Sequence, residues 1–197
     1  DELDGAVVAF PQDVIRPLAR PIFAQGGIAV LRGNLAPGGA IIKQSAADPG
    51  LMQHEGRAVV FENAADRALR LDRDDRDVAA EDILVLRNIG RAGVKDMLRI
   101  SDGRMSGTAA GTIVLHVTPE AALGGPLAYV ETGDRIRLDV ANRSLTLLVD
   151  DAELQRRRDA RPVTAPRAER GYLKLFLDTV TQADQGVDFD FLRAPKK

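Results

Sequence analysis

Residues 101–108 read SDGRMSGT and lie between two apolar runs, VKDMLRI at 94–100 and GTIVLHV at 111–117. Apolar runs of this length are typical of buried elements. The connection between them is polar and contains two glycines. A connection of this kind can present backbone N–H groups and short side chains to a ligand. The same residue types also form ordinary turns, because Asp-Gly and Ser-Gly are common loop dipeptides. The stretch therefore predicts two buried elements that are joined either by a binding loop or by a simple turn.

Other short apolar runs predict strands along the rest of the chain, because each is bounded by glycine, proline or polar residues. In residues 135–140 apolar residues alternate with charged ones, so this strand has one solvated face. The connectors 132–134 and 141–143 favour antiparallel turns around it. Residues 34–39 contain strong turn formers and predict a loop. The predicted strands occupy residues 27–31, 40–43, 56–61, 83–86, 113–117, 127–131, 135–140 and 144–149.

Helical patterns are short. Residues 62–71 have amphipathic spacing, and residues 171–180 predict a last helix. Thr118, followed by Pro119 and Glu120, is typical of a helix start. Residues 150–153 resemble a capping box, and we interpret the arginines at 156–158 as a complement to the dipole of the helix that follows, rather than as an anion site.

About eight short strands with few helices favour an α+β class, as a β-barrel-like domain with short flanking helices. We expect this domain to span residues 1–160. Residues 161–167 contain two prolines, and we expect residues 161–197 to form a linker, a helix and a C-terminal tail.

The overall composition limits the possible partners and chemistry. The chain has 197 residues, a net charge of −2 and no cysteine. It therefore gives no electrostatic basis for binding nucleic acid or an anionic membrane, and it cannot supply cysteine ligands to a cluster. No apolar run reaches the length of a membrane span. A reducing, cytoplasmic setting is the expectation that follows.

Ser106 is the best single candidate for catalysis. A serine hydroxyl is a poor base unless a metal ion or another cation stabilises its alkoxide. Arg104 is two residues away, but one arginine does not supply enough charge, so further charge must come from elsewhere. A Ser-His-Asp triad with Ser106 and His116 can be written, although His116 lies in a predicted strand and is expected to be packed there.

Several motifs, in collinear order over nearly the whole chain, resemble the C-terminal domain of the dihydroxy-acid and sugar-acid dehydratases. The motifs are AVLRGNLAP at 29–37, HEGRA at 54–58, SDGRMSGT at 101–108, HVTPEA at 116–121 and GGPLA at 124–128. RGY at 170–172 and ADQGVDFDFL at 183–192 resemble the tail of the aldonic-acid branch. This likeness favours a sugar acid such as arabinonate or xylonate over a branched-chain amino-acid precursor.

The resemblance implies a hydro-lyase with a swivelling β-barrel-like domain. In such an enzyme an iron–sulfur cluster, of the 2Fe-2S or 4Fe-4S type, acts as Lewis acid on the departing 3-hydroxyl, and Mg²⁺ holds the carboxylate and 2-hydroxyl. Ser106 matches the serine whose alkoxide removes the C2 proton, and Thr108 matches a substrate contact; we expect Arg104 to contact substrate as well. The family forms homodimers or homotetramers. Its partners would thus be a small acid and copies of the same chain, with neither nucleic acid nor membrane.

Two departures from the family pattern matter. The family binds its cluster, and most of its Mg²⁺, through an N-terminal domain that has no counterpart in this sequence. The family also has a GGPGMPE segment after the strand that matches residues 83–87, and the glutamate of that segment is a magnesium ligand. Here Gly90 is followed directly by Arg91, so we expect such a segment to be missing between them, leaving no metal ligand of the family in the chain.

Two other functions stay open. The chain could be a catalytically incomplete, stand-alone domain that binds an acid ligand or a partner through the same polar stretch. It could also be a serine hydrolase, which predicts that a fluorophosphonate probe labels Ser106.

Overall fold

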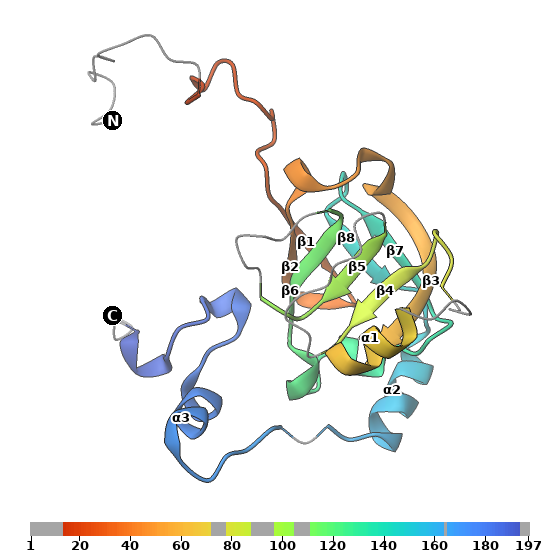
Figure 1. Ribbon diagram of the computed structural model, residues 1–197, viewed down its shortest axis with the longest axis vertical. Coiled ribbons are helices and arrows are strands. Elements are labelled where there is room, and N and C mark those ends of the chain that lie inside the picture. Colours follow the sequence, from red (N-terminus) through yellow and green to blue (C-terminus); the bar gives the residue numbers. More distant parts are fainter. Residues whose placement is uncertain (1–13, 72–77, 88–96, 105–110, 164, 194–197) are drawn as a thin grey trace.

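The computed structural model describes residues 14–71, 78–87, 97–104, 111–163 and 165–193, and it shows a closed β-barrel (Figure 1). Neighbouring strands follow the order β1-β2-β6-β5-β4-β3-β7-β8 around the barrel. The strands are β1 (Ala29–Gly33), β2 (Ala36–Ile42), β3 (Gln53–Phe61), β4 (Ile83–Leu86), β5 (Leu98–Ser101), β6 (Ile113–Thr118), β7 (Arg135–Asp139) and β8 (Ser144–Leu147). The expected barrel within the α+β class is confirmed.

The barrel combines two kinds of strand pairing. Strands β3, β4, β5 and β6 run parallel to one another, whereas β1-β2, β2-β6, β3-β7 and β7-β8 are antiparallel pairs. Every residue of β4 and β5 is buried, as expected for parallel strands covered on both faces. In β7 buried and exposed residues alternate along its first four positions, which confirms the solvated face predicted from the sequence.

Apolar side chains form one main core inside the barrel and a smaller cluster outside it. The main core contains members from every strand, for example Leu31, Ile83, Ile100 and Leu138, each of which is fully buried. The outer cluster consists of Val59, Phe61, Leu84, Leu86 and Met97. Helix α1 (Ala64–Leu71) follows β3, and its Arg70 stacks over the Phe61 ring with Cζ 4.6 Å from the ring centroid.

Most predicted strands are present within a few residues, but two elements were predicted wrongly. Residues 127–131 form a 3-10 helix, η4 (Pro126–Tyr129), and a loop instead of a strand. The helix expected after Thr118 is a single 3-10 turn, η3 (Ala121–Leu123), whose cap residue Glu120 makes no side-chain cap bond. The Thr118 hydroxyl donates to the carbonyl oxygen of His116, and Thr118 is the last residue of β6 rather than a helix cap.

The turn predicted at residues 34–39 is shorter than expected. Strand β2 already begins at Ala36, so Asn34 and Leu35 alone form the hairpin connection. The Asn34 side chain reaches β8, where its amide nitrogen donates to the Leu147 carbonyl and its oxygen accepts from the Leu147 N–H, both at 2.8 Å. These two bonds join the β1-β2 hairpin to the neighbouring strand β8. The connection is therefore a two-residue turn rather than the longer loop that the turn formers indicated.

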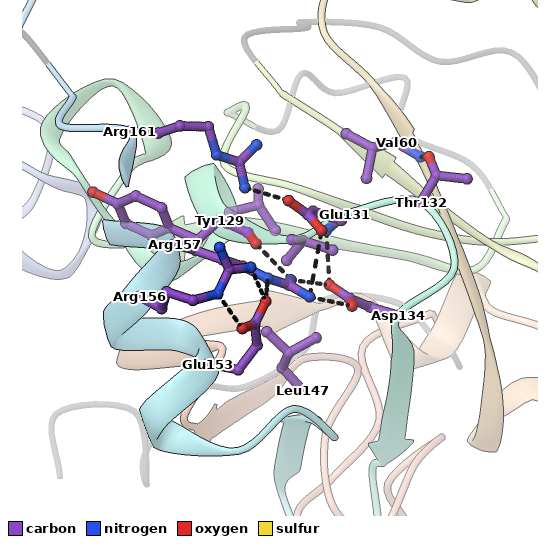
Figure 2. Close-up of polar contacts among 12 residues, drawn as sticks. Val60, Tyr129, Glu131, Thr132, Asp134, Leu147, Glu153, Arg156, Arg157 and Arg161 are labelled. Atoms are coloured by element: carbon purple, nitrogen blue, oxygen red, sulfur yellow. Dashed lines mark hydrogen bonds and ion pairs between the residues drawn. The ribbon is translucent and has the colours of Figure 1, made fainter. Parts of the chain in front are cut away.

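Helix α2 (Asp151–Ala160) is attached to the barrel through a buried ion-pair cluster (Figure 2). The Asp150 side chain caps the helix by accepting from the Glu153 N–H at 2.7 Å, as the capping box predicted. Arg157 is 7% exposed and donates both terminal nitrogens to the Asp134 carboxylate at 2.7 and 3.0 Å. It also donates to Glu153 and to the Tyr129 carbonyl.

This cluster extends the interpretation of the arginines at 156–158. Arg157 and Arg158 lie in the last turn of α2, where a positive charge complements the helix dipole. Arg157, however, also neutralises the nearly buried Asp134. Hydrogen bonds from Arg156 and Arg157 lower the pKa of Glu153 from 4.5 to about 2, so this carboxylate stays ionised at neutral pH.

The predicted last helix is present as α3 (Gly171–Thr179), which lies to one side of the barrel in Figure 1. None of its residues is buried. The chain continues through two 3-10 turns, η5 (Ala183–Gln185) and η6 (Asp190–Leu192). Between β2 and β3 lie two further turns, η1 (Gln44–Ala46) and η2 (Pro49–Leu51). Among the described residues, no helix has the length and apolar character needed to cross a bilayer.

Candidate functional site

The parallel strands β3, β4 and β5 end side by side at one edge of the barrel. Their last residues Phe61, Leu86 and Ser101 are paired in register. The residues that follow each strand therefore leave the barrel at this edge, which we call the carboxyl edge. Ligands of sheets with parallel strands commonly bind beyond the carboxyl ends of the strands. The carboxyl edge is the candidate functional site.

Both segments that the sequence singles out begin at the carboxyl edge. Ser106 and Thr108 follow β5, and the Gly90–Arg91 junction follows β4. These positions lie outside the described residues. The strand ends that lead into them, Leu86 and Ser101, are direct neighbours. The order of the strands thus brings together the starts of two segments that are well separated in the sequence.

The first residues after β5 are fixed by hydrogen bonds. The buried Ser101 hydroxyl donates to the Leu86 carbonyl at 2.8 Å and accepts from the Gly103 N–H at 2.9 Å. The buried Asp102 carboxylate accepts from the Ala121 N–H at 2.8 Å. The hydroxyl of Ser101 and the carboxylate of Asp102 therefore anchor the start of the SDGRMSGT stretch to β4 and to η3.

Arg104 is the one predicted site residue whose surroundings the structure describes. Its Nη2 lies 3.4 Å from Oε1 of Glu120, and its Cζ lies 5.5 Å from the centroid of the Phe176 ring in α3. The Arg104 side chain keeps 31% of its surface exposed. A guanidinium that is partly open to solvent and already oriented by two neighbours is suited to binding an anion near this edge.

His116 lies beside the same stretch, within β6. Its N–H donates to the Gly103 carbonyl at 3.1 Å, and its backbone adopts a left-handed conformation with φ of 56°. Burial and the positive charge of Arg104 lower the pKa of His116, whereas Glu120 raises it. The neutral form is therefore favoured at neutral pH. The expectation of a packed histidine in a strand agrees with this position; the triad with Ser106 lies outside the described residues.

Arg87 is a residue of this edge that the sequence analysis missed. It is 7% exposed, and its Nε donates to the Leu127 carbonyl at 3.0 Å while Nη1 pairs with Glu62 at 2.5 Å. Its remaining terminal nitrogen donates to the Val130 carbonyl. The available signal was a charged residue placed directly after the apolar run at 83–86.

A pocket of about 460 Å³ opens beside Arg87. Its volume falls in the range of small-molecule sites. Arg87 and Glu62 supply its charged groups, and the rest of the lining is apolar: Ala121, Ala122, Ala128, Val163 and Pro166. The carboxyl edge therefore has a mostly apolar pocket beside the ion pair of Arg87 and Glu62.

The GGPLA motif at 124–128 has a structural reason at this edge. A Cβ atom on Gly125 would lie 1.8 Å from the Pro119 carbonyl oxygen, so no other residue fits. Gly124 adopts a left-handed φ of 80° as the cap of η3. The motif closes the turn that carries Ala121 and Glu120, the partners of Asp102 and Arg104.

The described residues do not form the metal sites that the resemblance implies. No group of three His, Asp or Glu residues among them is arranged to hold a metal ion, and the chain contains no cysteine. The described part of the chain thus does not fit an iron–sulfur cluster or a complete Mg²⁺ site, and no reaction step can be derived through either group from these residues.

Curated relatives are similar over most of the chain. It is 49% identical to the L-arabonate dehydratase of Azospirillum brasilense, over 93% of the chain and 36% of the relative. It is 44% identical to the 6-deoxy-6-sulfo-D-gluconate dehydratase of Pseudomonas putida, over 98% of the chain and 38% of the relative. For the dihydroxy-acid dehydratase of Syntrophobacter fumaroxidans the identity is 42%, over 88% and 34% respectively. The chain thus spans a little over a third of the length of these relatives.

The alignments also show residues that relatives have and this chain lacks. The alignment with the Azospirillum protein runs over 209 residues, which exceeds the 197 residues of the chain although only 93% of the chain takes part. The profile of the dihydroxy-acid/6-phosphogluconate dehydratase C-terminal family matches in two segments, 13–99 and 91–187. The two matched segments overlap at residues 91–99, directly after the Gly90–Arg91 junction. Because the two matches together cover most of the sequence, the chain belongs to the dihydroxy-acid/6-phosphogluconate dehydratase C-terminal family.

Proposed function

We propose that this chain is the catalytic-base domain of a hydro-lyase that converts a 2,3-dihydroxy sugar acid into a 2-keto-3-deoxy acid. The observation that carries the proposal is the register of Leu86 with Ser101. Leu86 and Ser101 are the last residues of neighbouring strands, and in the sequence the Gly90–Arg91 junction follows the first strand and Ser106 follows the second. Family membership supplies the reaction class, since the relatives are named as dehydratases.

The proposed roles of the chain's own residues follow from their chemistry. Ser106, as alkoxide, takes the proton from C2 of the acid. The electron pair of the C2–H bond forms a C2=C3 double bond, and the 3-hydroxyl leaves as water with the proton that Ser106 removed, which restores the alkoxide. The resulting enol tautomerises to the 2-keto acid. Thr108 and Arg104 contact the substrate, and Arg104 attracts its carboxylate.

A sugar acid is the proposed substrate class. Relatives named for L-arabonate and 6-deoxy-6-sulfo-D-gluconate are 49% and 44% identical, whereas the relative named dihydroxy-acid dehydratase is 42% identical. The tail motifs at 170–172 and 183–192 support the same choice. Arabinonate and xylonate are therefore the first substrates to test.

The remaining parts of the proposal concern the whole enzyme. We place the iron–sulfur cluster and Mg²⁺ in an N-terminal domain outside this chain, against which residues 1–160 form a swivelling barrel. The magnesium-ligating glutamate of the family belongs to a segment that this sequence lacks between Gly90 and Arg91. The assembled enzyme is a homodimer or homotetramer in the cytoplasm.

The direct test is Ser106→Ala in the holoenzyme, assayed as 2-keto acid formed from L-arabinonate and D-xylonate. We expect turnover to be lost while the absorption spectrum of the cluster stays unchanged. The matched control is Ser45→Ala in η1. Ser45 lies at the opposite end of the barrel, since Ile42, the last residue of β2, pairs with Val114 near the start of β6. Retained turnover in Ser106→Ala would overturn the role of this serine.

The intact mass of the purified protein decides whether the proposal applies to a complete enzyme. A mass well above 21.2 kDa indicates that further domains are present and supports it. A mass equal to that value favours the alternative, a domain that binds an acid ligand or a partner without turnover. Labelling of Ser106 by a fluorophosphonate would instead indicate a serine hydrolase.

A further inference from the structure

We propose that Phe176 of α3 is a positioning residue that orients the Arg104 guanidinium for the reaction. Through this contact the C-terminal segment of the chain affects the geometry of the carboxyl edge. The catalytic part of this inference rests on the proposed function. The segment consists of residues 171–193, from α3 to the turn after η6. It lies outside the barrel, and α3 buries none of its residues. Its attachment must therefore come from specific contacts rather than from a shared apolar core.

The first contact is the stacking of Arg104 on Phe176. The Cζ atom of Arg104 lies 5.5 Å from the centroid of the Phe176 ring, within the range of a cation–π interaction. The guanidinium is held on another side by Glu120, whose Oε1 lies 3.4 Å from Nη2. The ring and the carboxylate together limit the orientations that the guanidinium can adopt.

The second contact ties the same segment to the partner of Arg104. The Gln182 side-chain oxygen accepts from the Glu120 N–H at 2.8 Å. Gln182 is the residue just before η5, six positions after Phe176. The C-terminal segment thus holds both the cation and the residue that supplies its counter-charge.

The C-terminal segment is internally braced, so it can act as a fixed support. The Phe176 ring meets the rings of Tyr172 and Phe189 at centroid distances of 6.3 and 6.5 Å. Thr181 closes the chain between α3 and η6, because its N–H and hydroxyl both donate to the Asp188 carbonyl, at 2.9 and 3.0 Å. A bridge between Val180 and Phe189 lies beside these bonds.

The position of Arg104 explains why its orientation matters. It stands two residues before Ser106 and lies on a stretch anchored by Ser101, Asp102 and Gly103. The stretch is fixed up to Gly103 by contacts with the barrel and with η3. At Arg104 itself, the side-chain contacts that the structure describes are those with Glu120 and Phe176. Loss of the ring therefore affects the approach to the catalytic residue more than it affects the barrel.

The test compares Phe176→Leu, which removes the π face and keeps apolar volume, with Phe176→Tyr, which keeps the face. The control is Phe191→Leu, because the Phe191 ring belongs to the same cluster and stacks on the Phe189 ring, with the two centroids 5.4 Å apart. In the holoenzyme we expect Phe176→Leu to lower kcat/KM about two- to fivefold, as a partly exposed cation–π contact allows. Phe176→Tyr and Phe191→Leu should stay near the wild-type value.

A double-mutant cycle identifies the route of the effect. In an Arg104→Met background, Phe176→Leu should cause no further loss, because the ring then has no cation to orient. A purely structural role of Phe176 would instead give the same loss in both backgrounds. Equal kcat/KM for Phe176→Leu and Phe191→Leu would overturn the inference.

Hydrogen exchange separates this inference from the proposed function. In the full chain, the amides of Arg104 and Glu120, the residues that the C-terminal segment contacts, should exchange faster in Phe176→Leu than in Phe191→Leu, whether or not the protein acts on a sugar acid. Unchanged exchange at these amides would overturn the inference even if the holoenzyme is a dehydratase. Faster exchange in a protein that has no dehydratase activity would overturn the proposed function and leave the support of Arg104 by α3 established.

Discussion

Helices α2 and α3 are of similar length but are attached to the barrel in opposite ways. Helix α2 has 10 residues and buries Leu154 and Arg157, while α3 has 9 residues and buries none. The Asp150 side chain caps α2, whereas the residue before α3, Arg170, makes no cap bond. The apolar side chains Leu173 and Leu175 of α3 are 58% and 42% exposed.

The difference shows that the two helices serve different parts of the molecule. Burial and a buried ion pair make α2 a part of the scaffold, because removing either leaves a cavity or an unpaired charge. Helix α3 has neither, and its contacts lead to Arg104 at the candidate site. Substitutions in α2 should therefore change stability, and substitutions in α3 should change stability little.

The two tyrosines provide a probe for each region, since the chain has no tryptophan. Tyr129 is 6% exposed next to α2, and Tyr172 is 70% exposed in α3. In a Tyr172→Phe background, tyrosine fluorescence reports on the barrel end near α2. The three predictions below use urea unfolding followed by this signal.

The largest effect is expected for Arg157→Met. This change removes the partner of the nearly buried Asp134 carboxylate, which should lower the free energy of unfolding by about 3 kcal/mol or more. The matched change in α3 is Lys174→Met, which breaks an exposed pair with Asp178 and should cost less than about 0.5 kcal/mol. Similar losses for the two variants would contradict the contrast between the helices.

A smaller effect is expected for Leu154→Ala. Leu154 is 4% exposed and packs in the main core, so its truncation should lower the free energy of unfolding by about 2 kcal/mol or more. Leu173→Ala in α3 should stay within about 0.5 kcal/mol of the parent, because that side chain is 58% exposed. A large loss for Leu173→Ala would show that α3 belongs to the same cooperative unit through contacts of its own.

The smallest effect is expected at the helix caps. Asp150→Ala removes the bond to the Glu153 N–H and should lower the free energy of unfolding by about 1 kcal/mol. Arg170→Ala, at the equivalent position of α3, removes no cap bond and should leave the unfolding midpoint unchanged. If both variants shift the midpoint equally, the cap of α2 contributes nothing specific.

Elements with a strong local pattern were predicted well. The alternation at 135–140 identified β7, and the capping box at 150–153 identified the start of α2. The prediction was wrong at 127–131, where an apolar run forms η4. Leu127 and Val130 of this run are buried in the main core without pairing as a strand, and such burial leaves the same apolar composition as burial in a sheet. Local composition could not distinguish the two environments.

The candidate site was predicted in its polar stretch and missed in its supports. The residues 101–108 stand out because hydroxyls, glycines and charges interrupt apolar runs. Arg87 and Phe176 carry no such signal, since an arginine after a strand and an aromatic residue in a helix are ordinary. Their partners Glu62 and Arg104 lie 25 and 72 residues away in the sequence, so only the folded chain reveals the pairs.

The sequence by itself determined the class of the domain, its family and the polar stretch that leaves β5, because these follow from local periodicity and from motifs that can be read in order. Only the tertiary structure decided that β4 and β5 end as neighbours, that Arg157 is buried against Asp134 and that Phe176 faces Arg104. Each of these facts depends on contacts between segments that are distant in the sequence, and no local pattern encodes such contacts.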